Sequence, residues 1–206
     1  HRGASGHAPE NTMAAFRRAV ELGANFIETD LHTTRDAHLV CVHDVRLERT
    51  TNATGAVKDL TLAQLRALDA GSWYGPSFAG ERIPTLEEVL AFAREKDIVF
   101  FLEVKQEAAW GIEHGLVAAL RDAQEAARAV ILSFSPGVLR NVRRLDNTLM
   151  TGLLFEAMPG GGPDAIVDRA LEIGARQLAP RGDIVTPELL DRAHRNDLQV
   201  VSWTIN

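Results

Sequence analysis

Short apolar runs of strand length alternate along this chain with longer segments in which apolar residues recur at helical spacing. This alternation predicts parallel strands joined by crossover helices, and several runs are apolar at every position, as strands buried on both faces are. The fold class expected is therefore α/β. The predicted strands cover residues 26–31, 39–42, 99–104, 130–134, 152–155, 177–179 and 199–203.

Threonine residues mark the starts of several predicted helices. Thr61 and Thr85 are each followed three residues later by Gln or Glu, which is the capping-box pattern, and Thr186 stands before a proline. Asn11 or Thr12 is expected to cap a further helix. These starts agree with the apolar spacing that follows each of them.

One connection is too short for a parallel crossover. Only residues 33–38 separate the strands predicted at 26–31 and 39–42, so these two strands should form an antiparallel hairpin. A hairpin that leaves one end of a sheet returns to the same end. His43-Asp44 should therefore lie close to the residues that end the first strand.

Charged residues stand at the ends of two predicted strands. Glu28 and Asp30 lie two positions apart, and the two-residue period of a strand places both side chains on one face. Glu103 and Lys105 repeat this geometry at the carboxyl end of another strand. Both pairs are expected at the same mouth of a barrel.

Three inward-facing carboxylates need a cation, because burying an unpaired carboxylate costs several kcal/mol or forces it to take up a proton. All-oxygen ligation by Glu28, Asp30 and Glu103 favours Mg²⁺ or Ca²⁺ over zinc, which prefers nitrogen and sulfur. The alternative is that these charges form ordinary salt bridges, for example Glu103 with Lys105 or Asp30 with Arg2. Two charged pairs combined with two histidines favour the metal site.

Two histidines accompany charged residues in predicted loops. His1 precedes Arg2, and His43 precedes Asp44. Phosphodiester cleavage needs one group to deprotonate the attacking oxygen and another to protonate the leaving oxygen, and two histidines can fill both roles near neutral pH. Arg2 and Lys105 would hold the phosphoryl oxygens. The histidines outside any motif are expected to be surface or hydrogen-bonded structural residues: His7, His32, His38, His114 and His194.

Composition narrows the classes of function. The 206 residues fit one domain, and the net charge of −6 argues against a nucleic-acid binder, which would show a basic face. No run approaches the roughly 20 apolar residues of a membrane span, so a soluble protein is expected. Its low cysteine content favours a cytoplasmic location while leaving the redox compartment open. The single cysteine, Cys41, excludes an intramolecular disulfide and should pack as a small core residue. Trp203 could contact substrate at the mouth or pack in the core.

Six motifs, in their order along the chain, resemble the signature of the glycerophosphodiester phosphodiesterase family. They are His1-Arg2-Gly3, Pro9-Glu10-Asn11-Thr12, Glu28-Thr29-Asp30, His43-Asp44, Leu102-Glu103-Val104-Lys105 and Trp203-Thr204-Ile205-Asn206. The resemblance implies a distorted TIM (β/α)8 barrel over residues 1–206, with a small insertion at about 44–84. Barrel strands before His1 and after Asn206 are missing from this sequence, so the native chain is expected to be longer at both ends.

The resemblance also implies metal-dependent hydrolysis of glycerophosphodiesters to sn-glycerol 3-phosphate and an alcohol. The glycerol 2-hydroxyl would attack phosphorus, and water would then open the cyclic phosphate. The roles implied are acid/base catalysis by His1 and His43, metal binding by Glu28, Asp30 and Glu103, substrate contact by Arg2, Lys105 and Trp203, and support by Glu10 and Asn11. A lysophospholipase D-like or sphingomyelinase D-like activity and a barrel that binds phosphodiesters without turnover are the alternatives.

Ala37 departs from the family pattern, because it stands where the hairpin turn usually has glycine. An altered turn is therefore expected there, away from the site.

Overall fold

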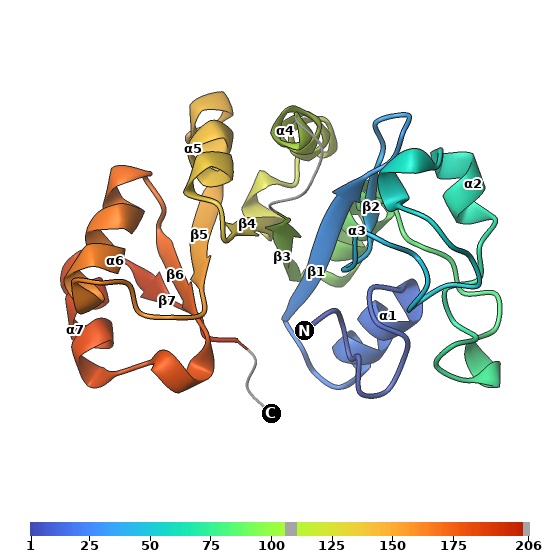
Figure 1. The fold of residues 1–206 in the computed structure, drawn as a ribbon, viewed down its shortest axis with the longest axis horizontal. Helices are drawn as coiled ribbons and strands as arrows, with labels where there is room; N and C mark the ends of the chain where they lie inside the picture. Colours follow the sequence, from blue (N-terminus) through green and yellow to red (C-terminus); the bar gives the residue numbers. More distant parts are fainter. Residues whose placement is uncertain (106–110, 204–206) are drawn as a thin grey trace. The chain divides into compact units, whose positions relative to one another are not determined.

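A computed structural model describes residues 1–105 and 111–203 of the chain (Figure 1). The chain divides into two compact units, His1–Ala129 and Val130–Asn206. Helices and strands alternate in both, as the hydrophobic pattern predicts. The elements in chain order are α1 (Met13–Glu21), β1 (Phe26–Thr33), β2 (Leu39–Cys41), η1 (Val57–Asp59), α2 (Leu62–Arg66), η2 (Pro76–Phe78), α3 (Leu86–Lys96), β3 (Val99–Val104), α4 (Ile112–Ala123), η3 (Ala126–Arg128), β4 (Ala129–Ser133), α5 (Pro136–Leu145), β5 (Met150–Phe155), α6 (Gly162–Glu172), β6 (Gln177–Pro180), η4 (Gly182–Ile184), α7 (Pro187–Arg195) and β7 (Gln199–Val200).

In the first unit, β1 lies between β2 and β3. β1 and β3 are parallel, with Asp30 opposite Glu103 in the register. The core behind them is apolar, and the ring of Phe16 on α1 meets that of Phe100 on β3 edge to face at 5.2 Å. The parallel register places the carboxyl ends of β1 and β3 side by side.

The predicted hairpin is confirmed. β1 and β2 pair antiparallel, with Leu31 opposite Cys41 and Thr33 opposite Leu39, and Figure 1 shows them side by side. The Val42 amide continues the pairing by donating to the Asp30 carbonyl at 3.1 Å. The chain after β2 therefore returns to Asp30, in the middle of β1.

The segment between β2 and α3 contains only short helices, η1, α2 and η2, and it has a small core of its own. Thr61 and Thr85 form the two predicted capping boxes, at the starts of α2 and α3. The residues of this core are Val40, Val42, Leu47, Val57, Leu65, Ala70 and Ile83. Because Val40 and Val42 belong to it, the segment is anchored to β2 and to the residues that follow that strand.

Thr12 caps α1, and this leaves Asn11 available for other contacts. The Thr12 hydroxyl accepts from the Ala15 amide at 3.3 Å. The predicted cap at Thr186 is also present, at the start of α7. The two alternatives for the first helix are therefore decided in favour of Thr12.

In the second unit, β4, β5, β6 and β7 form a run of parallel strands. β7 ends at Val200, shorter than predicted, and an isolated parallel bridge then pairs Arg181 with Trp203. Among the residues the structure describes, no helix combines the length and apolar character that crossing a lipid bilayer requires.

The hairpin turn generates a prediction about stability. Ala37 has a φ of +66° and donates its amide to the Thr34 carbonyl at 3.1 Å. The left-handed conformation costs an L-residue about 1–2 kcal/mol, and glycine avoids this cost. Part of the gain is lost because glycine has more conformational entropy to lose on folding than alanine. Ala37→Gly should therefore raise the free energy of unfolding by about 0.5–1 kcal/mol, measured by urea denaturation.

Ala63→Gly is the matched control, because Ala63 is exposed within helix α2. Glycine there should destabilise the protein by about 1 kcal/mol. A loss of stability in both variants would contradict strain at Ala37.

Candidate active site

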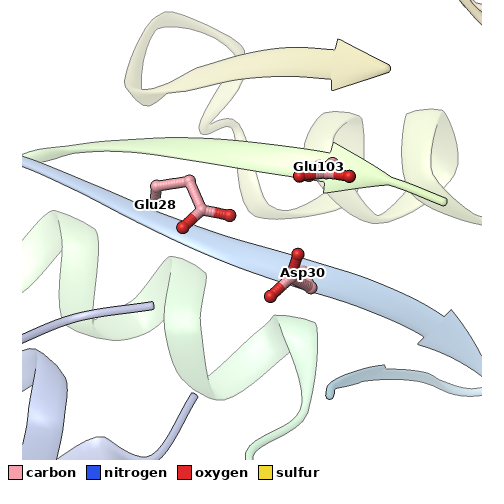
Figure 2. Close-up of side chains that lie close together, drawn as sticks. All are labelled: Glu28, Asp30 and Glu103. Carbon is pink, nitrogen blue, oxygen red and sulfur yellow. The ribbon is translucent and has the colours of Figure 1, made fainter. Parts of the chain in front are cut away.

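Three carboxylates meet where β1 and β3 run side by side. Glu28 and Asp30 extend from β1 and Glu103 from β3 (Figure 2), and one oxygen of each lies within 4.8 Å of the others. The two-residue period of β1 and the register of Asp30 opposite Glu103 produce this arrangement. The predicted convergence of the three acidic groups is therefore present, within the first unit.

Glu28 is only partly compensated. Its Oε2 accepts the Arg2 backbone amide at 2.7 Å, whereas its buried Oε1 has no hydrogen-bond partner among the described residues. Burial and, next, the neighbouring Asp30 carboxylate raise the pKa of Glu28 to about 8. The negative charge of this group is thus disfavoured unless a cation is near.

Lys105 lies between the other two carboxylates. Its Nζ is 2.7 Å from Asp30 Oδ1 and 2.7 Å from Glu103 Oε1. Burial alone would lower the pKa of Lys105, but the Asp30 and Glu103 carboxylates outweigh it, and the net pKa is raised. Burial raises the pKa of Glu103, although Lys105 opposes this. Arg2 supplies the second cation, with Nε 3.4 Å from Asp30 Oδ2.

The residues present fit a hard divalent cation. Oxygen ligands lie about 2.0–2.6 Å from Mg²⁺ or Ca²⁺, so two ligands of one ion are at most roughly 4–5 Å apart, and the three carboxylates meet this limit. The unpartnered Oε1 of Glu28 is an acceptor that such an ion would satisfy. With all three carboxylates ionised, Lys105 and Arg2 would leave one negative charge for such an ion to neutralise.

The first residues of the chain are fixed on β1 and α1. The Gly3 amide donates to the Glu28 carbonyl at 3.2 Å, and a Cβ at Gly3 would lie 2.8 Å from Ala15. Arg2 itself has a φ of +55°, an uncommon conformation for an arginine. His1 is exposed and directly precedes the residue whose amide binds Glu28.

Asn11 orients the most buried carboxylate. Its Nδ2 donates to Asp30 Oδ2 at 2.9 Å, and its Oδ1 accepts from the Thr29 hydroxyl at 2.7 Å. The backbone amide of Asn11 donates to the Arg2 carbonyl at 3.1 Å. Asn11 thus connects the loop before α1 to the middle of β1 and orients the Asp30 carboxylate.

His43 follows β2 and is held from two sides. Its Nδ1 lies 2.6 Å from Asp44 Oδ1, and its carbonyl accepts from His32 Nε2 at 3.1 Å. His32 is buried, and burial lowers its pKa. His32 is thus hydrogen-bonded, one of the two environments expected for it, and its structural role stays a prediction.

Arg49 connects Asp44 to Glu10. Its Nε is 2.6 Å from Asp44 Oδ2, and its Nη1 and Nη2 are 2.9 and 2.7 Å from the two Glu10 oxygens. Glu10 also binds Arg2, whose Nη1 lies 3.0 Å from Oε1. Burial of Glu10 acts to raise its pKa, but Arg49 and Arg2 outweigh this, and the net pKa is lowered. Sequence reasoning missed Arg49, because no spacing links it to either carboxylate.

Trp203 belongs to the second unit. Its Nε1 donates to the Ala179 carbonyl at 2.8 Å, and its ring meets Phe134 edge to face at 5.7 Å. Residues 204–206 of its motif lie outside the described residues. Contact of Trp203 with substrate stays a prediction.

Cys41 packs in the interior of the first unit. It is 1% exposed, and burial raises the pKa of its thiol to about 12. The prediction of a small core residue is confirmed.

A family model of the glycerophosphoryl diester phosphodiesterases matches residues 1–206. The chain belongs to this family. A glycerophosphodiester phosphodiesterase from Caldanaerobacter subterraneus subsp. tengcongensis is 41% identical over 208 residues, covering 100% of this chain and 84% of the relative. A putative glycerophosphodiester phosphodiesterase from Bacillus subtilis is 39% identical over 211 residues, with coverage of 100% and 84%. The chain is thus an enzyme of the phosphodiesterase class, as the order of its motifs predicts.

Solved structures of the family match the fold. A phosphodiesterase from Oleispira antarctica in complex with the product sn-glycerol-3-phosphate is 28% identical, with a TM-score of 0.88 over 100% of this chain and 83% of its own. A glycerophosphodiester phosphodiesterase from Agrobacterium tumefaciens is 25% identical, with a TM-score of 0.85 over 98% and 84%. The predicted fold class, the α/β barrel of this family, is confirmed.

The raised pKa of Glu28 predicts how stability depends on pH without metal. Its pKa rises from the ordinary 4.5 to about 8 on folding, so between these values the folded state binds more protons than the unfolded chain. The free energy of unfolding should therefore fall as pH rises through this window. Glu28→Gln, which cannot ionise, should flatten the slope, measured by urea unfolding at several pH values in EDTA.

Glu87→Gln is the control for this prediction, because Glu87 is exposed in α3. It should keep the slope of the unsubstituted protein. Identical slopes for Glu28→Gln and the unsubstituted protein would exclude a proton held by Glu28 in the folded state.

Proposed function

We propose that the enzyme hydrolyses glycerophosphodiesters to sn-glycerol 3-phosphate and an alcohol, with a divalent cation held by Glu28, Asp30 and Glu103. The observation that carries this proposal is the acidic cluster itself, whose oxygens lie within 4.8 Å of one another. The names of the relatives and the product in the Oleispira antarctica complex support the choice of substrate. Mg²⁺ and Ca²⁺ both suit the all-oxygen ligand set.

The cationic side chains would bind the phosphodiester. Arg2 presents a guanidinium that can contact two phosphoryl oxygens, and Lys105 presents an ammonium point charge. Both already lie against Asp30, at 3.4 and 2.7 Å. A bound divalent cation would offset negative charge on the phosphoryl oxygens. Arg2, Lys105 and the cation would thus surround the phosphoryl group of the substrate with positive charge.

His1 and His43 would move the protons. One histidine takes the proton of the glycerol 2-hydroxyl as its oxygen bonds to phosphorus, and the other protonates the alcohol oxygen as the phosphorus–oxygen bond to it breaks. A water oxygen then bonds to phosphorus as its proton passes to the histidine that protonated the alcohol, and the bond from phosphorus to the 2-oxygen breaks as the other histidine returns its proton to that oxygen. The product is sn-glycerol 3-phosphate. Attack by an oxygen of the substrate itself gains effective molarity, because nucleophile and phosphorus are already joined.

The experiment that tests this proposal measures release of glycerol 3-phosphate from glycerophosphocholine. EDTA should abolish turnover, and Mg²⁺ or Ca²⁺ should restore it. Glu103→Gln should shift the metal titration to higher concentration, because one anionic ligand is lost, whereas Glu87→Gln should not. Turnover that EDTA leaves intact, or an unchanged titration in Glu103→Gln, would refute the metal site.

Lysophosphatidylcholine and sphingomyelin serve as comparison substrates in the same assay. Turnover of these lipids in place of glycerophosphodiesters would favour the lysophospholipase D-like or sphingomyelinase D-like activity. A folded protein that turns over none of them would favour a barrel that binds phosphodiesters without catalysis.

His43→Ala should lower kcat by about 10² to 10⁴, the usual contribution of acid/base catalysis. The matched control is His38→Ala, because His38 is an exposed histidine in the nearby hairpin turn. Steady-state kinetics on glycerophosphocholine measure both variants. Activity of His43→Ala equal to that of His38→Ala would exclude an acid/base role for His43.

A further inference from the structure

The carboxylate of Asp44 is bound from two directions. His43 Nδ1 lies 2.6 Å from its Oδ1, while Arg49 lies 2.6 Å from Oδ2 through Nε and 3.1 Å from Oδ1 through Nη2. A fork of this kind fixes the plane of a carboxylate as well as its position. The orientation in which Asp44 meets the His43 ring is therefore set by Arg49.

The same guanidinium reaches the loop before α1. Two of its nitrogens bind the two oxygens of Glu10, and Glu10 is 39 residues away in the sequence. Glu10 in turn binds Arg2. Arg49 thus joins the loop that carries Arg2 to the segment that carries His43, in a chain of charged hydrogen bonds.

Stability alone is a weak reason for this arrangement. The Arg49 side chain is 44% exposed and that of Asp44 is 30% exposed, and ion pairs between exposed side chains contribute little to stability. The planar fork of a guanidinium fixes the geometry of the carboxylates that it contacts. The partners of those carboxylates are the two residues proposed to handle protons and phosphate.

We infer that Arg49 is a positioning residue, which holds Asp44 against His43 and so sets the orientation and tautomer of the His43 ring. With Asp44 accepting from Nδ1–H, the other ring nitrogen, Nε2, is left for proton transfer. Arg49 lies in the segment between β2 and α3, so this segment contributes a positioning residue to the active site. The inference rests on the proposed role of His43.

The first test is kinetic. Arg49→Gln should lower kcat for glycerophosphocholine by roughly 10- to 100-fold, because a misplaced catalytic group costs up to about 10². Arg49→Lys, which keeps the charge without the fork, should recover part of the loss. Arg46→Gln is the matched control, because Arg46 is an exposed arginine of the same segment that pairs with Glu48. The control should keep full activity.

A double-mutant cycle separates positioning from a general structural effect. If Arg49 acts through His43, adding Arg49→Gln to His43→Ala should lower kcat no further. If the two losses multiply, the inference is overturned. A parallel cycle with Glu10→Gln measures the contribution of the path to Arg2, which should appear mainly in KM.

The second test needs no turnover. Proton NMR should show a downfield Nδ1–H signal for His43, assigned by its absence from His43→Ala. The signal should be lost or shifted in Arg49→Gln and kept in Arg46→Gln. An unchanged signal in folded Arg49→Gln would overturn the inference, whereas absent turnover with the signal behaving as expected would overturn only the proposed function.

Discussion

Repulsion among three carboxylates on two adjacent strands, β1 and β3, is the constraint on which the active site depends. The pairing of Asp30 with Glu103 across β1 and β3 makes their proximity unavoidable. The surrounding groups offset this repulsion: Lys105 lies between two of the carboxylates, the Arg2 amide binds the third, and the Asn11 amide group fixes Asp30. What they leave uncompensated is the charge that a divalent cation can neutralise.

The hairpin explains how distant parts of the sequence share one site. Because β2 returns antiparallel along β1, the residues that follow β2 come back to Asp30. The segment after β2 then packs on its own apolar core, which includes Val42. Arg49 also binds this segment to Glu10. Apolar packing and charged hydrogen bonds together therefore hold His43 in position.

Some features of this site were open to sequence reasoning and others were not. Residues two apart in a strand share a face, so the two-residue period of a strand alone predicted that the Glu28 and Asp30 side chains lie on the same face. The capping boxes at Thr61 and Thr85 are likewise local. The choice of Thr12 over Asn11 as a cap was not, because it depends on the contact of Asn11 with β1. The role of Arg49 depends on Glu10, which no local pattern connects to it.

The sequence by itself determined the alternation of strands and helices, the hairpin and the ordered motifs, because these follow from local periodicity, chain length between elements and residue identity. Tertiary structure alone decided which hydrogen bonds each charged group makes and how burial shifts the pKa of Glu28. The physical reason is that electrostatic interactions depend on distance and on exclusion of water, and both are set by residues far apart in the chain.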